Sequence, residues 1–357
     1  MIKRRETRTV TIGNVKIGSG YPVAIQSMTK VLTSDIKAAS AQIRELEGAG
    51  CEIVRVAVKS EDDANAIAAI KQETTKPLVA DIHFDHRLAV TAADKGADKI
   101  RINPGNITEP SDIDAVIDAV SERNIPVRLG VNSGSLIDVT TGRAASVDMM
   151  VDSLTDYIEH FHKRKFDDIV LSLKSSDVPR TVEAYRKMAE RCDYPFHLGV
   201  TAAGLPADGM VRSSVGIGSL LLDGIGDTIR VSLTGDSVEE VHTAKRILDS
   251  VGSRHFGSRI IACPTCGRCQ VDLVSIVQEL ETELKRNTKN DIQNTDKQLL
   301  IAVMGCEVNG PGEAMEADIG IAFGKGKGVI FRRGEIVKTI KADLAVKELL
   351  EMIREET

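Results

Sequence analysis

Residues 99–132 read KIRINPGNITEPSDIDAVIDAVSERNIPVRLGVN and contain one complete strand–helix–strand unit. The two ends of this stretch, Lys99–Asn103 and Pro126–Val131, are short and rich in Ile and Val, as in the buried strands of a parallel sheet. Between them, Ser111–Arg123 carries apolar residues at helical spacing. The stretch therefore predicts the unit from which parallel sheets with covering helices are built.

The same unit repeats through the first 254 residues. The expected strands are Pro22–Met28, Glu52–Val58, Pro77–Ile82, Lys99–Asn103, Pro126–Val131, Asp168–Lys174, Pro195–Val200 and Asp227–Leu233. Helical stretches such as Asp35–Ala49, Ser60–Glu73 and Val238–Val251 lie between them. About eight such units in some 250 residues have the size and order of a (β/α)8 TIM barrel. An open doubly wound sheet is the alternative, but it usually has fewer strands, and no GxGxxG turn follows any strand here.

Two segments flank this repeat. Before it, Thr7–Ile17 reads as a short β-hairpin that turns at Gly13-Asn14. After it, from residue 255 to residue 357, the pattern changes to a smaller α+β domain. Its expected elements are a strand at 259–262, a helix at Asp272–Arg286, strands at Leu299–Met304, Ile319–Phe323 and Gly328–Phe331, and a helix near Asp343–Glu355. The chain is therefore expected to form two domains, 1–254 and 255–357.

The overall composition excludes several classes of protein. A formal net charge of −6 argues against nucleic acid or an anionic membrane surface as the main partner. No apolar run approaches the ~20 residues that span a bilayer, and no apolar stretch follows the basic N-terminus as in a secretory signal. We therefore expect a cytoplasmic protein. In that compartment the six cysteines stay reduced, so clustered thiols indicate metal binding or catalysis.

Polar side chains stand where the expected barrel strands end, which is where such barrels carry their chemistry. These residues are Arg55, His83, Arg101, Asn103, Arg128, Asn132, Lys174, Arg230 and Ser232. Side chains alternate along a strand, so Arg101 and Asn103 face the same way. A buried cation is costly unless it is paired, and converging guanidiniums suit phosphate oxygens. The pattern predicts a pocket for a phosphorylated small molecule.

Three cysteines form a CxxCxxC motif, Cys263, Cys266 and Cys269, and Cys306 follows a later strand. Thiolates at this spacing can bind one zinc ion or one iron–sulfur cluster. Zinc usually takes two compact knuckles, and Cys306 has no cysteine or histidine beside it. This favours the cluster, with zinc as the alternative. The isolated Cys51 and Cys192 are expected to be small core residues.

The motifs ACPTCGR and MGCEVNGPGEA, together with IRINPGNI, DIHFD, HLGVT and GIGDTIRVSLT, resemble the 4-hydroxy-3-methylbut-2-enyl diphosphate synthase family. The resemblance runs over nearly the whole chain and is to the bacterial two-domain form. It implies an iron–sulfur oxidoreductase of the methylerythritol phosphate pathway of isoprenoid biosynthesis. The implied reaction opens and dehydroxylates 2-C-methyl-D-erythritol 2,4-cyclodiphosphate, with electrons from flavodoxin or ferredoxin. It also implies a homodimer in which the cluster domain of one subunit covers the barrel of the other.

The resemblance also implies roles for single residues. A [4Fe–4S] cluster would be held by Cys263, Cys266, Cys306 and Glu313, so that Cys269 is not a ligand although its spacing alone nominates it. Asn309 and Glu313 would act in catalysis beside the cluster. The substrate would be bound by Arg55, His83, Arg101, Arg128, Asn132 and Arg212. The pattern of polar strand ends adds Lys174, Arg230 and Ser232 to these binding residues. One departure stands out, because the family commonly has an acidic Glu where this chain has Ala202.

Two other functions remain open from the residues alone. A pterin-binding-type barrel transferase with a structural zinc would share the barrel, but the second zinc knuckle is missing. A non-enzymatic iron–sulfur electron carrier would explain the cysteines but not the arginines of the barrel.

Overall fold

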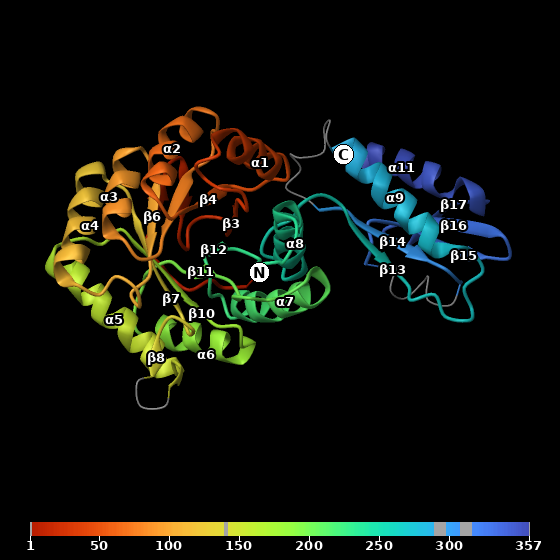
Figure 1. The fold of residues 1–357 in the computed structure, drawn as a ribbon. Coiled ribbons are helices and arrows are strands. Elements are labelled where there is room, and N and C mark those ends of the chain that lie inside the picture. The colour runs from red at the N-terminus through yellow and green to blue at the C-terminus, as the bar shows by residue number, and fades with distance from the viewer. Residues whose placement is uncertain (1, 139–141, 289–297, 308–315, 357) are drawn as a thin grey trace. The chain divides into compact units, whose positions relative to one another are not determined.

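The computed structural model describes residues 2–138, 142–288, 298–307 and 316–356 (Figure 1). The chain divides into two compact units, Met1–Arg254 and His255–Thr357, and each is described here by itself.

The first unit is a barrel of eight parallel strands with the order β10-β7-β6-β5-β4-β3-β12-β11. The strands are β3 (Ala24–Met28), β4 (Ile53–Val58), β5 (Leu78–Ile82), β6 (Lys99–Ile102), β7 (Val127–Asn132), β10 (Ile169–Lys174), β11 (His197–Leu198) and β12 (Thr228–Ile229). A bridge between Leu171 and Phe196 brings the β10 and β11 edges together, so the sheet nearly closes. The predicted TIM barrel is confirmed, and the open doubly wound sheet is excluded.

Helices cover the outside of this barrel (Figure 1). They are α1 (Ile36–Gly48), α2 (Glu61–Gln72), α3 (His86–Asp94), α4 (Pro110–Arg123), α5 (Val147–Lys163), α6 (Val178–Ala189), α7 (Pro206–Leu222) and α8 (Ser237–Ser250). Several begin at an acidic or hydroxyl side chain that accepts a hydrogen bond from the first turn, such as Asp35 for α1 and Ser60 for α2. Gly216 lies inside α7, where an added Cβ would lie 2.8 Å from a methyl of Val200. Close packing of this helix on the barrel explains that glycine.

A β-hairpin closes the N-terminal end of the barrel. Its strands are β1 (Val10–Ile12) and β2 (Val15–Ile17), with Gly13 at φ +56° in the predicted turn. The buried side chains of the hairpin pack in one cluster with residues at the beginnings of four barrel strands. This cluster comprises Val10, Ile12, Ile17, Ala24, Ile53, Val79 and Val170. The expectation that the polar side chains stand at the C-terminal ends of the strands holds for Asn132 and Lys174, which end β7 and β10, but not for Arg128, which is the second residue of β7 and pairs in register with Val170 of this cluster. A small hairpin of β8 (Ile137–Asp138) and β9 (Arg143–Ala144) follows β7.

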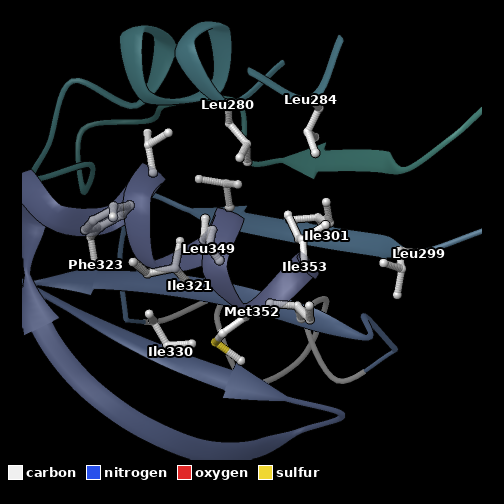
Figure 2. Packing of buried hydrophobic residues seen from close by; sticks show 14 of the residues in the cluster. Leu280, Leu284, Leu299, Ile301, Ile321, Phe323, Ile330, Leu349, Met352 and Ile353 are labelled. Carbon is white, nitrogen blue, oxygen red and sulfur yellow. The ribbon is translucent and has the colours of Figure 1, made fainter. Parts of the chain in front are cut away.

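The second unit is a five-stranded sheet with the order β13-β14-β15-β16-β17. Its elements are β13 (Arg259–Ala262), α9 (Leu273–Thr288), β14 (Leu300–Met304), β15 (Ile319–Gly324), β16 (Lys327–Arg332), β17 (Glu335–Lys341), η1 (Ala342–Leu344) and α11 (Ala345–Glu356). Figure 2 shows the core between sheet and helices, where Leu280 of α9 and Leu349 of α11 are fully buried with Ile321 and Phe323 of β15. The edge strand β17 was not predicted, because none of its residues is buried and no apolar face marks it in the sequence.

Candidate functional site

The barrel interior gathers charged side chains from adjacent strands. Arg55 on β4, Asp81 on β5 and Arg101 on β6 are all buried, as is Arg128 on β7. Asp81 lies opposite Arg101 in the β5–β6 register, and Arg101 lies opposite Arg128 in the β6–β7 register. The strands therefore bring three of the predicted arginines together around a buried carboxylate that the sequence did not single out.

Asp81 is the hub of this group and is only 3% exposed. Its carboxylate lies 3.1 Å from Nη1 of Arg101, 3.8 Å from Nε of Arg55 and 3.5 Å from Nε2 of His83. Burial by itself would raise the pKa of Asp81, but the two guanidiniums outweigh it and hold that pKa well below its ordinary value. Asp81 is therefore a fixed negative charge that orients three predicted binding residues.

Arg101 is fixed on both sides, because its Nη2 also donates to the carbonyl of Gly130 at 2.9 Å. A Cβ on Gly130 would lie 2.8 Å from Nε of Arg101 and equally close to Oγ of Ser172. Glycine at this strand position therefore makes room for the guanidinium.

Arg128 is the least compensated cation of the group. It is 1% exposed, and within the described part of the chain its Nε and Nη1 have no hydrogen-bond partner. Burial, followed by repulsion from Arg55 and Arg101, lowers its pKa well below the ordinary value. Burial also lowers the pKa of Arg55 to about 10. Unpaired buried donors are costly, so this compartment is built to receive acceptor oxygens.

A second ion pair lies at the end of β12. Nε of Arg230 donates to Glu240 of α8 at 3.2 Å, and Glu240 is 1% exposed. The same carboxylate accepts from Oγ of Ser27 at 3.0 Å and lies 3.1 Å from Nζ of Lys30. Ser232, two residues beyond Arg230, is partly exposed. Glu240 thus fixes Arg230 much as Asp81 fixes Arg101.

The other predicted binding residues are placed less uniformly. Lys174 ends β10 and is buried, with its Nζ beside Gly199, where an added Cβ would lie 3.0 Å from it. Asn132 ends β7 and is partly exposed. Arg212 lies on α7 and is exposed, and its Nη1 lies 3.5 Å from the carbonyl of Ala203. Beside that carbonyl, Ala202 has a left-handed φ of +50°.

Three further polar side chains in the barrel strands were not among the predicted site residues. Lys99 of β6 and His197 of β11 are fully buried, and Gln26 of β3 is 1% exposed. Among the residues that the structure describes, Nζ of Lys99, Nε2 of His197 and the side-chain amide of Gln26 have no hydrogen-bond partner. Burial, and then repulsion from Arg128, lowers the pKa of Lys99 well below the ordinary value. Lys99 lies two residues before Arg101, so side-chain alternation puts both on the same face of β6. The sequence could therefore have predicted that Lys99 is buried in the barrel together with Arg101.

The cysteines of the second unit occupy two loops, after β13 and after β14. The backbone N–H of Gly305 donates to Sγ of Cys263 at 3.2 Å. A Cβ on Gly305 would overlap Sγ of Cys269 and lie 3.4 Å from Sγ of Cys263. Cys306 is buried, and Cys266 is exposed. The structure therefore places the expected ligand Cys263 beside Cys269, which the family resemblance does not count as a ligand. The expected ligand Cys266 is exposed to solvent.

As placed, no three His, Cys, Asp or Glu side chains of the described residues are arranged to hold a metal ion. The donor types nevertheless fit a soft metal or a cluster, because four thiols lie on two loops that meet at a glycine. A hydrogen bond from the backbone of Arg268 lowers the pKa of Cys266, which favours the thiolate form that binds metals. Glu313 and Asn309 lie outside the described residues.

No helix in the described ranges is long and apolar enough to cross a membrane.

Known proteins resemble the chain at two levels. The barrels of dihydropteroate synthase from Yersinia pestis and of type I 3-dehydroquinate dehydratase from Clostridium difficile superpose with TM-scores of 0.51 and 0.50. These chains are 12% and 14% identical to this one, and they cover 68% and 69% of it and are themselves 98% covered. At such identities the likeness shows the fold alone.

Sequence relatives are far more similar. A curated 4-hydroxy-3-methylbut-2-en-1-yl diphosphate synthase (flavodoxin) from Clostridium perfringens is 49% identical over 99% of both chains. A protein of the same name from Nitratidesulfovibrio vulgaris is 52% identical over 95% of this chain and 86% of its own. Residues 7–245 match the GcpE TIM-barrel domain, and residues 259–355 match the GcpE protein C-terminal domain. The chain therefore belongs to the GcpE family.

Proposed function

We propose that the chain converts 2-C-methyl-D-erythritol 2,4-cyclodiphosphate to 4-hydroxy-3-methylbut-2-enyl diphosphate, as an oxidoreductase of isoprenoid biosynthesis with flavodoxin as electron donor. Its relatives carry the name of this activity over nearly the full length of the chain. The observation that carries the proposal is the guanidinium of Arg128, which is buried beside Arg55 and Arg101 and whose Nε and Nη1 have no hydrogen-bond partner among the described residues. Such a compartment requires an anion, and a cyclic diphosphate is one.

The residues of the barrel bind and orient this substrate. Arg128 donates from Nε and Nη1 to the diphosphate oxygens, and Arg101 and Arg55 are held ready by Asp81. Burial, followed by repulsion from Arg128, lowers the pKa of Lys174 at the end of β10 well below its ordinary value, and a bound diphosphate would favour its ammonium form. Arg230 is held by Glu240, and Asn132, Ser232 and Arg212 supply the remaining polar contacts around the organic part of the ligand. Substrate charge replaces solvent around these cations, so water is excluded from the compartment on binding.

Cys263, Cys266, Cys306 and Glu313 would hold a [4Fe–4S] cluster in the second unit, with Asn309 beside it. When bound, the cluster supplies single electrons and a Lewis-acidic iron for breaking the carbon–oxygen bond. Cys266 would turn inward from its exposed position to bind. Gly305 leaves space for sulfur where any side chain would overlap it.

The departing oxygen needs a proton, and Ala202 has none to give. His83 is the residue that we propose for this step, because its Nε2 lies 3.5 Å from the buried carboxylate of Asp81 while the ring remains partly exposed. An imidazole whose Nε2 is held by a carboxylate can take a proton from solvent on its other ring nitrogen, Nδ1, and pass it on from there. His83→Gln would keep a hydrogen-bond donor but lose this transfer, so kcat would fall more than substrate affinity.

We also propose that the chain works in the cytoplasm as a homodimer. Sedimentation of the purified chain at micromolar concentration measures this, and a monomer that turns over substrate at full rate would contradict the dimer.

The decisive experiment is anaerobic purification followed by counts of iron, zinc and labile sulfide, together with turnover of the cyclic diphosphate by reduced flavodoxin. We expect iron and sulfide in near-equal amounts, with loss of turnover in Glu313→Ala. Binding of inorganic pyrophosphate tests the barrel separately, with Arg128→Met as the variant and the surface Arg164→Met as its control. One zinc per chain without sulfide would end the cluster assignment, and unchanged pyrophosphate binding in Arg128→Met would end the barrel assignment.

A further inference from the structure

The structure assigns a redox role to Cys269, which spacing nominates as a ligand and the family resemblance sets aside. We propose that Cys263 and Cys269 form a reversible disulfide when an oxidant removes the metal centre. Both sulfurs lie within 3.4 Å of one point, the Cβ position that Gly305 lacks. The absence of a side chain at Gly305 is what allows two thiols to face each other there.

Backbone contacts hold the two thiols in this arrangement. The N–H of Gly305 donates to Sγ of Cys263 at 3.2 Å, while Sγ of Cys269 donates to the carbonyl of Val271 at 3.3 Å. The N–H of Gln270 donates to the carbonyl of Gly305 at 3.1 Å, which ties the first cysteine loop to the second. The backbone of the two cysteine loops therefore positions both thiols.

The turn between the two cysteines separates Cys266 from this pair. Thr265 has a left-handed φ of +52°, and the N–H of Cys269 donates to the carbonyl of Cys266 at 2.9 Å. This turn brings Cys269 back toward Cys263 and leaves Cys266 exposed. Cys263 and Cys269 also pack against the apolar core of the unit, which leaves access to a small oxidant and hinders a protein disulfide partner.

The chemistry balances with peroxide as the oxidant. Hydrogen peroxide oxidises the thiol of Cys263 to a sulfenic acid and leaves as one water. The thiol of Cys269 then attacks that sulfur, the S–S bond forms, and a second water is released. Two thiols thus lose two electrons and two protons to one peroxide. Because the disulfide blocks further oxidation to sulfinic acid, a thiol reductant can restore Cys263 for metal binding.

This inference rests on the proposed function only in taking Cys263 to be a ligand. The disulfide would form whichever metal the thiols hold, so counting iron, zinc and sulfide before oxidation keeps the two questions apart.

The full chain is purified anaerobically, oxidised with peroxide, alkylated and digested with trypsin. Cleavage after Arg268 separates residues 260–268, which contain Cys263 and Cys266, from residues 269–285, which contain Cys269. We expect these two peptides to be joined, with fragmentation placing the bond on Cys263. Dithiothreitol should release them, and Cys266→Ser should leave the link in place.

Variants test the protective role. In Cys269→Ser we expect no link, Cys263 recovered as sulfinic or sulfonic acid, and loss of metal reloading after reduction. Cys192→Ser, at a half-buried cysteine of the barrel unit, is the matched control and should behave like the parent chain. A link through Cys266 or Cys306, two separate alkylated peptides, or equal reloading of Cys269→Ser and the parent would each overturn the proposal.

Discussion

Replacing Asp81 by Asn removes the carboxylate that Arg101, Arg55 and His83 share. Asn keeps an oxygen that can accept from Arg101, so the geometry of the 3.1 Å contact is nearly preserved and the change is mainly one of charge. Removing one partner of a buried ion pair costs about 3–5 kcal/mol, because the remaining charges stay buried and unpaired. We expect about 3 kcal/mol here, which for a unit of this size lowers Tm by about 6–12 °C.

The ligand should reverse this loss. A diphosphate supplies the negative charge that the variant lacks, so inorganic pyrophosphate should raise the Tm of Asp81→Asn by more than it raises that of the parent chain. Thermal unfolding followed by circular dichroism, with and without pyrophosphate, measures both effects. Asp118→Asn is the control, because its side chain is 60% exposed and its ion pair with Arg164 lies at the surface. That change should cost no more than about 1 kcal/mol, and pyrophosphate should raise the Tm of this variant by as much as it raises that of the parent chain.

The pH dependence gives an independent check. The folded pKa of Asp81 lies well below the unfolded value of about 3.9, so its contribution to stability is complete above that value and is lost as the pH falls toward the folded pKa. The difference in stability between parent and variant should therefore be constant from about pH 8 to pH 5 and shrink below about pH 4. Equal stability of the two chains at pH 7, with equal stabilisation by pyrophosphate, would refute the role of Asp81.

Three other substitutions test particular contacts. Lys99→Met removes a buried amine that lacks a partner within the described chain, and it should raise Tm at pH 7. The gain should shrink toward pH 10, because the unfolded lysine then loses the proton that burial keeps off the folded one. Gly305→Ala should reduce iron loading because its Cβ overlaps the sulfur of Cys269, and the double variant with Cys269→Ala should regain it. Gly130→Ala places a Cβ 2.8 Å from Nε of Arg101 and should weaken pyrophosphate binding by about tenfold, or ~1.4 kcal/mol, measured by calorimetry.

The barrel could be predicted from the sequence because its strands are buried on both sides. In β4 and β10 nearly every residue is buried, so the strands read as continuous apolar runs with a few charges inside them. The edge strand β17 has no buried residue, and its sequence EIVKTIK differs little from that of an exposed connection. Burial, more than strand propensity, decided which elements could be recognised.

The charged residues were recognisable singly, but their partners were not. Asp81 lies two residues before His83, so alternation along β5 puts both on one face. What the sequence could not supply is that Arg101 of the next strand would approach the same carboxylate, because that depends on register between strands. The cysteine loops could not be predicted for a different reason. The CxxCxxC spacing does not indicate which thiols become neighbours, because that depends on the left-handed backbone conformation at Thr265.

The described barrel interior carries an excess of positive charge that the fold does not neutralise. Arg230 has Glu240, but Asp81 is shared by Arg55 and Arg101, while Arg128 and Lys99 keep unpaired donors. Neutralising either of these two should therefore make the ligand-free chain more stable, and neutralising Arg128 should at the same time weaken diphosphate binding. The substitution Arg128→Met should thus raise the stability of the ligand-free chain and weaken pyrophosphate binding. Asp81→Asn should do the reverse, lowering the stability of the ligand-free chain and strengthening pyrophosphate binding. A variant of Arg128 that lost both stability and affinity would mean that the guanidinium supports the barrel itself, and the anion site would then have to be sought elsewhere.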